Sequence, residues 1–177
     1  TIYMIMELID GPNLADLVTA KGPLTSQEAG EIILDVARAL SFAARQEIPL
    51  VHRDIKPQNI MRTQGGRVLL LDLGLAGFIE DDSLAVPAIP EELPVDEQAT
   101  PAAARLTDGL TVLGTPAYMA PEQILNPRKT DVRSDIYSLG CTFRFLWTGQ
   151  TFHEGLRVKE ALDATLRGVQ PALQEIL

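Results

Sequence analysis

The segment from His52 to Asn59 constrains the fold of this chain more than any other stretch. It reads His-Arg-Asp-Ile-Lys-Pro-Gln-Asn, so one short polar loop carries a carboxylate, an ammonium and a carboxamide. Asp54 can accept a hydroxyl proton, Lys56 can hold the charge of a phosphate, and the amide oxygen of Asn59 can ligate Mg²⁺. A chain that uses these groups together must fold so that all of them face one cleft.

Two short strands are expected directly after this loop, at about 60–62 and 67–71. The Gly-Gly pair between them favours a hairpin turn. The second strand ends at Asp72, whose carboxylate is another hard oxygen ligand for a cation. Because a hairpin returns the chain toward its starting point, we expect Asp72 to face Asn59. A metal, a phosphate and a hydroxyl acceptor would then share one cleft, which is the arrangement of phosphoryl transfer.

Most of the remaining sequence is expected to be helical and to belong to one domain. Thr25 and Glu28 form a capping-box pattern at the start of a long amphipathic helix, which ends before Pro49. Residues 134–147 are apolar almost all round, so we expect a central buried helix with Ile136 among its buried residues. The other expected elements are a buried strand at 1–9 and helices at 14–20 and 158–167.

Negative charge is concentrated in residues 80–108, which hold eight acidic side chains against one arginine. The stretch also holds four prolines and no aromatic residue, so it can bury little apolar surface and is expected to be a mobile insert. The net charge of −9 argues against binding nucleic acid or an anionic membrane as the main role. No apolar run reaches the ~18 residues that a membrane span needs.

Two side chains that often carry chemistry are expected to be structural or solvated here. Cys141 is the single cysteine and lies on an apolar helix, so we expect a small buried hydrophobic residue. A lone cysteine also fits a reducing compartment, and we expect a cytoplasmic protein. His153 is expected to be a solvated loop residue.

Four motifs follow one another along the chain: HRDIKPQN (52–59), DLG (72–74), GTPAYMAPE (114–122) and DVRSDIYSLG (131–140). In this order and at these spacings they resemble the eukaryotic-type serine/threonine protein kinases, including their bacterial members. The resemblance implies an α+β fold, the large C-terminal lobe of a protein kinase, mostly helical with a small β-hairpin beside the catalytic loop. It makes residues 1–9 the hinge strand, 72–122 the activation segment around the acidic insert, and 131–177 the helices of the lobe.

The same resemblance implies transfer of the γ-phosphate of ATP to Ser or Thr hydroxyls of a protein substrate, with Mg²⁺ as cofactor. Asp54 would orient and deprotonate the acceptor hydroxyl, and Lys56 would hold the γ-phosphate. Asn59 and Asp72 would carry the two Mg²⁺ ions. Thr115 would bridge Asp54 and Lys56 and help to set the preference for Ser or Thr.

Regulatory and structural roles are implied for further residues. Thr111 falls where the family's activating phosphothreonine sits, with Thr107 as its nearest alternative, and Arg53 would be the cationic partner of that phosphate. Asp135 would accept hydrogen bonds from the backbone of the catalytic loop. His52 would pack in the core of the lobe.

The nucleotide site is implied around the first strand. Met6 would be the gatekeeper, and the backbone groups of Glu7 and Ile9 would bond the adenine edge. Asn13 would contact the ribose, and Met61 would pack under the adenine.

The chain also departs from the family pattern. It holds no Gly-rich phosphate loop and no lysine before the expected hinge, and the family's later arginine that pairs with Glu122 is missing. We therefore expect a fragment in which the small lobe is largely absent, Glu122 is unpaired and the isolated chain is inactive or nearly so. The alternative is a non-catalytic, kinase-derived binding or scaffold module.

Overall fold

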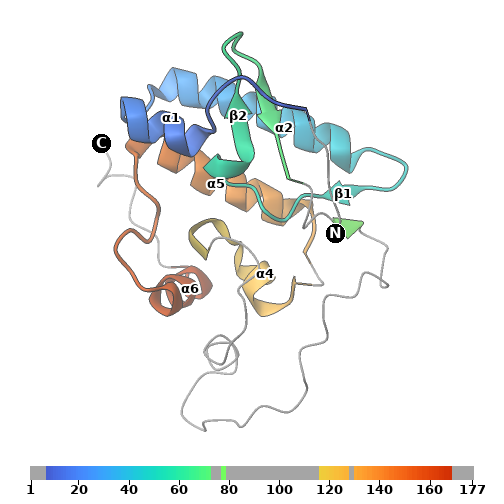
Figure 1. The fold of residues 1–177 in the computed structure, drawn as a ribbon. Helices are drawn as coiled ribbons and strands as arrows, with labels where there is room; N and C mark the ends of the chain where they lie inside the picture. The colour runs from blue at the N-terminus through green and yellow to red at the C-terminus, as the bar shows by residue number, and fades with distance from the viewer. Residues whose placement is uncertain (1–6, 73–76, 79–115, 128–129, 169–177) are drawn as a thin grey trace, which may run out of the picture.

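A computed structural model describes residues 7–72, 77–78, 116–127 and 130–168 of the chain. Its main feature is a pair of long helices, α2 (Ser26–Ala44) and α5 (Val132–Thr148), which pack against each other. Helix α1 (Leu14–Lys21) contacts α5 near one end of this pair. In Figure 1, α4 (Pro121–Leu125) and α6 (Val158–Leu166) lie below α5, while α2 lies above it.

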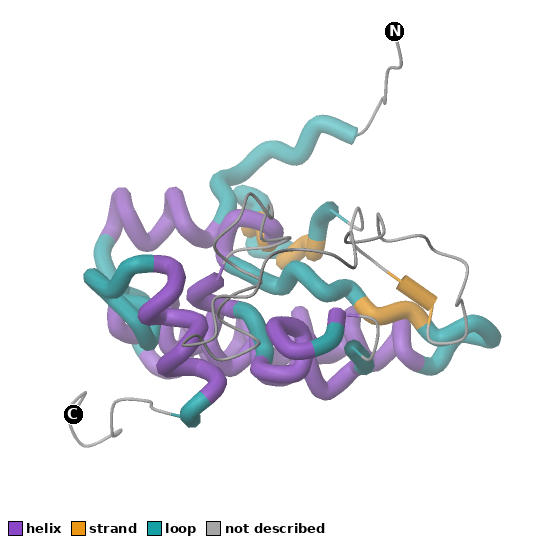
Figure 2. Tube along the Cα trace, turned by 90° about the horizontal axis from the view of Figure 1, so that it is seen from below, coloured by secondary structure: helices purple, strands orange, loops and turns teal. Residues whose placement is uncertain are grey.

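The strands form two small antiparallel pairs. Strand β2 (Ile60–Arg62) pairs with β3 (Val68–Leu70), so the predicted hairpin is present, and Gly66 takes a positive φ of 83° in its turn. Strand β1 (Leu50–Val51) pairs with β4 (Gly77–Phe78). The loop between β1 and the 3₁₀ turn η1 (Pro57–Asn59) runs alongside the helices (Figure 2).

The hydrophobic core joins helices α1 and α2 to α5 and to the polar loop. Ile55 and Ile60 from the loop and β2 are almost fully buried in it, so the loop is held by apolar contacts on one side. Burying such a side chain contributes about 1.5–3 kcal/mol. The other buried members are Leu14, Leu17, Val18, Leu24, Ala29, Ile32, Val36, Leu139 and Leu146.

Helix α2 begins as its sequence predicts. The Thr25 hydroxyl accepts a hydrogen bond from the Glu28 N–H at 3.2 Å, and the Thr25 N–H donates to the Glu28 carboxylate at 3.2 Å. Ala29, Ile32 and Val36 line its buried face. The amphipathic pattern and the capping box are therefore confirmed.

Helix α5 corrects one expectation about its faces. Ile136 is 64% exposed, although the sequence predicted it to be buried. Five polar residues are buried instead, because α5 also packs against the 3₁₀ turn η3 (Pro116–Tyr118) and supplies side chains that hydrogen-bond to neighbouring backbone. They are Ser134, Asp135, Ser138, Thr142 and Arg144.

The expected strand at 1–9 is wrong in the part that the structure describes. Residues 7–9 form no strand, and Leu8 is 95% exposed. No strand pairs with them among the described residues. Residues 1–6 and the acidic insert at 80–108 lie outside the described residues.

His153 is also buried, which corrects the prediction of a solvated residue. The residue is 8% exposed, and its Nε2 lies 2.9 Å from the Thr165 hydroxyl of α6. The Arg144 guanidinium lies nearby, over the Phe152 ring, and donates to the carbonyls of residues 150 and 151. Burial lowers the pKa of His153, and the Arg144 charge lowers it further.

Cys141 is buried as predicted, and burial raises the pKa of its thiol to about 12. None of the helices in the described ranges has the length and apolarity that a membrane span requires.

Replacing Thr25 by Ala should lower the free energy of unfolding by about 1 kcal/mol, because the N–H of Glu28 loses its capping oxygen. Equilibrium urea denaturation followed by circular dichroism measures this. The control is Ser26→Ala, one residue further along the same exposed turn. Equal stability of Thr25→Ala and the control would contradict the prediction.

Acid should destabilise the fold through His153. Because its folded pKa lies below the ordinary value of about 6.5, the unfolded chain binds the proton more readily. This contribution to stability is present above pH ~6.5 and is lost as the pH falls through the folded pKa. In His153→Gln, unfolding free energies between pH 7.5 and 5.5, about one unit either side of that value, should fall less than in the unaltered protein. A parallel fall in both proteins would show that other groups cause it.

Candidate active site

The polar loop is held at its start by one buried carboxylate from α5. Asp135 is 3% exposed, and its two oxygens accept hydrogen bonds from the backbone N–H groups of His52 and Arg53, each at 2.8 Å. Burial raises the pKa of Asp135, while these two hydrogen bonds act in the opposite direction. These are the contacts with the catalytic-loop backbone that the kinase resemblance implies for Asp135.

The His52 ring joins the loop to the end of the hairpin. Its Nδ1 accepts from the N–H of Asp54 at 3.3 Å, so Nε2 carries the proton and donates to the Leu71 carbonyl at 2.9 Å. The N–H of Leu71 donates to the Asn59 carbonyl at 2.8 Å. Asp72 follows Leu71 directly, with a positive φ of 62°, and therefore comes next to the backbone that carries Asn59.

Three side chains meet at the Asp54 carboxylate. The Lys56 ammonium lies 2.7 Å from Oδ2 of Asp54. The Asn59 carboxamide donates from Nδ2 to the same oxygen at 2.8 Å and to the Asp54 carbonyl at 2.9 Å. Both donors of Asn59 thus point at Asp54, so Oδ1 of Asn59 is left as the atom suited to ligate a cation. The sequence predicted this trio, and the structure brings it together.

The donor set around Asn59 suits a magnesium ion that also uses ligands from a bound phosphate. Mg²⁺ in proteins takes one or two protein oxygens and completes its shell with water and substrate phosphate. Asn59 and Asp72 offer an amide oxygen and a carboxylate of that kind. Within the described ranges no group of three or more His, Cys, Asp or Glu side chains could hold a metal by itself.

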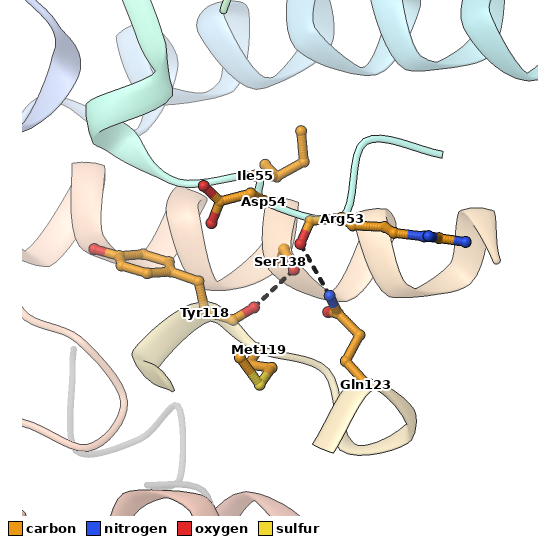
Figure 3. A pocket seen from close by; sticks show the side chains of 7 residues that line it. All are labelled: Arg53, Asp54, Ile55, Tyr118, Met119, Gln123 and Ser138. Atoms are coloured by element: carbon orange, nitrogen blue, oxygen red, sulfur yellow. Dashed lines mark hydrogen bonds between the residues drawn. The ribbon is translucent and has the colours of Figure 1, made fainter. Parts of the chain in front are cut away.

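The segment 116–125 lies against the loop and forms the wall of a small pocket. Figure 3 shows this hollow between the loop, α4 and α5. Gln123 donates from Nε2 to the Arg53 carbonyl at 2.9 Å, and the Ser138 hydroxyl donates to the Tyr118 carbonyl at 2.7 Å. The lining residues are Arg53, Asp54, Ile55, Tyr118, Met119, Gln123 and Ser138.

Glu122 is not unpaired, which corrects the sequence-based expectation. Its carboxylate accepts a hydrogen bond of 2.6 Å from the Ser134 hydroxyl of α5. Sequence reasoning missed Ser134, Ser138 and Gln123 as site-forming residues. Ser134 and Ser138 had a visible signal, because polar residues four apart in an otherwise apolar helix share one face. Gln123 had none.

The residues expected around the nucleotide are only partly brought together. Asn13 and Met61 form an antiparallel bridge, which sets the chain after residue 7 beside β2. The Asn13 carboxamide caps α1, accepting from the Asp16 N–H and donating to the Asp16 carboxylate, each at 2.8 Å. Glu7 is exposed and Ile9 half-buried. Met6, Thr111 and Thr115 lie outside the described residues.

Comparison with known proteins points to one family. The model of the protein kinase domain matches residues 1–175. Serine/threonine-protein kinase PknB of Mycobacterium tuberculosis is 36% identical over 148 residues, which are 84% of this chain and 20% of that protein. The probable serine/threonine-protein kinase PknB of Corynebacterium glutamicum is 35% identical over 153 residues, 86% of this chain and 20% of that protein.

The chain thus spans about a fifth of the length of the curated relatives that it matches. The match nevertheless covers nearly all of the chain, including the loop that carries Asp54, Lys56 and Asn59. On this evidence the chain belongs to the protein kinase domain family.

Proposed function

We propose that this chain is the large lobe of a serine/threonine protein kinase, which transfers the γ-phosphate of ATP to Ser or Thr hydroxyls of a protein substrate. The observation that carries the proposal is the trio at one carboxylate oxygen: Lys56 and Asn59 both contact Oδ2 of Asp54, at 2.7 and 2.8 Å. A carboxylate base, an ammonium group and the amino end of a carboxamide meet there, on a loop whose backbone is fixed by α5. The relatives' names and the family support the same reaction.

Within this proposal Asp54 receives the incoming hydroxyl and takes its proton as the new O–P bond forms. The bond between the γ-phosphorus and the β,γ-bridging oxygen breaks at the same time, and ADP leaves with that electron pair. Lys56 stabilises the charge of the transferred phosphoryl group, for which it must turn from Asp54 toward the phosphate. Asn59 keeps Asp54 oriented through its two N–H donors, and its Oδ1 and the Asp72 carboxylate would hold Mg²⁺. When bound, Mg²⁺ neutralises the charge on the phosphate oxygens.

The nucleotide is proposed to lie beside β2, where the Asn13–Met61 bridge brings residues 7–13 against the hairpin. Backbone groups of Glu7 and Ile9 would bond adenine, and Met61 would pack against it. The ribose contact of Asn13 stays a prediction, and in the structure the Asn13 side chain caps α1. Thr115 remains a prediction for the bridge between Asp54 and Lys56.

The catalytic role of Asp54 can be tested in the full-length natural protein by transfer of labelled phosphate from ATP. Asp54→Asn removes the base but keeps the size of the side chain, so transfer should fall at least ~100-fold while nucleotide binding persists. Asp35→Asn, on the exposed side of α2, is the matched control and should transfer normally.

Equal labelling by the Asp54→Asn variant and the unaltered protein would contradict the proposal. Absence of labelling by both, together with no thermal shift on adding ATP, would favour a binding or scaffold module. A competent nucleotide site at 100-fold excess over Kd should stabilise the fold by ~2.7 kcal/mol.

Thr111 is proposed as an activating phosphorylation site that engages Arg53. The Nε of Arg53 is buried, and it finds no hydrogen-bond partner within the described part of the chain. A phosphate adds about −1.5 to −2 charges and several acceptors, which suit a guanidinium of this kind. Thr111→Ala should lower transfer and remove the phosphate found by mass spectrometry in peptides covering 106–128, and Thr107→Ala should do neither. The reverse result would assign the site to Thr107.

A further inference from the structure

Arg53, directly before the proposed base, is held in an unfavourable backbone conformation. Its φ is +66°, in the left-handed region of backbone conformation that residues other than Gly rarely adopt. Such a strained residue persists only when its surroundings determine it. The contacts made by the backbone of Arg53 therefore identify the parts of the molecule that fix the orientation of Asp54.

Side chains hold the peptide group between Arg53 and Asp54 at both ends. Its N–H, which belongs to Asp54, donates to Nδ1 of His52 at 3.3 Å. Its carbonyl, which belongs to Arg53, accepts from Nε2 of Gln123 at 2.9 Å. Rotation of this peptide plane would turn the Cα–Cβ bond of Asp54, so the two contacts together set the direction of the carboxylate.

The Gln123 carboxamide is itself held in one orientation. Its Oε1 accepts from the N–H of Ala120 at 3.0 Å, while its Nε2 faces the Arg53 carbonyl. The flipped carboxamide would place a donor against the Ala120 N–H and an oxygen against the Arg53 carbonyl. The carboxamide of Gln123 therefore faces the Arg53 carbonyl with its N–H donor and not with its oxygen, as Figure 3 shows.

Gln123 also connects two segments that are 70 positions apart. It lies on α4, which is anchored to α5 by the hydrogen bond between Glu122 and Ser134. The preceding turn η3 is anchored to the same helix through Tyr118 and Ser138. Gln123 is therefore the direct hydrogen-bonded link between this segment and the peptide plane of Asp54.

We infer that Gln123 is a positioning residue for phosphoryl transfer, which sets the direction of the Asp54 carboxylate according to the position of the segment 116–125. This inference rests on the proposed kinase function. The side-chain hydrogen bonds of Gln123 both go to backbone groups, so its effect falls on the rate of transfer rather than on nucleotide binding. A displacement of a reacting group by about 1 Å can cost on the order of 100-fold in rate.

Three substitutions in the full-length protein separate the two hydrogen bonds of Gln123. Gln123→Glu keeps an acceptor for Ala120 but turns an oxygen toward the Arg53 carbonyl, and Gln123→Met removes both contacts. Both should lower kcat by ~10- to 100-fold with KM for ATP changed less than about twofold. Gln123→Lys restores a donor toward Arg53 and should recover most of that loss. Gln27→Glu, on the exposed face of α2, is the control for the same chemical change.

Amide hydrogen exchange of the peptide covering 53–55 supplies a readout that does not need activity. Exchange should be faster in Gln123→Glu and Gln123→Met than in the unaltered protein, and slower again in Gln123→Lys. Normal kcat and normal exchange in Gln123→Met would overturn the inference, as would equal losses in the Lys and Met variants. If Gln123→Glu does not fold, the comparison of Lys with Met decides. Absence of transfer by the unaltered protein would count against the proposed function, while the exchange result would still decide the positioning role.

Discussion

Asp135 is the group on which the rest of the site depends. One buried carboxylate, on the central helix, accepts the N–H groups of two consecutive loop residues that lie 83 and 82 positions earlier in the chain. Removing a carboxylate from water is costly, and only a fixed set of donors offsets that cost. The two hydrogen bonds attach the loop rigidly to the core of the fold. They also fix the backbone conformation of the loop at His52 and Arg53.

Arg53, the second residue of this attachment, has a strained backbone, and the polar side chains of the site follow it directly. The left-handed Arg53 is followed by Asp54 and then by Ile55, whose side chain is buried in the hydrophobic core. Apolar anchoring behind the loop and hydrogen bonding in front of it leave the carboxylate little freedom. This is preorganisation in the ordinary sense: the ordering is achieved during folding, and under the proposed function it would not have to be repeated on substrate binding.

The buried polar side chains of α5 also fix the positions of neighbouring segments. Ser134, Ser138 and Asp135 each hold a different neighbouring segment: α4, the η3 turn and the loop. A helix with only apolar side chains would pack equally well but would not specify how these segments are placed along it. Gln123 also donates to the Arg53 carbonyl. The loop and the segment 116–125 are therefore connected twice, directly by this hydrogen bond and indirectly because both are hydrogen-bonded to α5.

The sequence by itself determined what depends on near neighbours. The capping box at Thr25, the hairpin around Gly66 and the limits of α1 and α6 follow from patterns within a few residues, and each was predictable. The motif in the loop likewise predicted the trio of Asp54, Lys56 and Asn59, because all three lie within one turn of chain.

Only the tertiary structure decided which polar residues would be buried and what they would touch. His153 and Ile136 exchanged their expected environments, since the face that α5 and the following loop present is set by packing against elements outside their own sequence. The contact between Gln123 and Arg53 has no local signature, as it exists only once α4 has docked on α5. Long-range hydrogen bonds of this kind arise from packing, and periodicity within a segment carries no information about them.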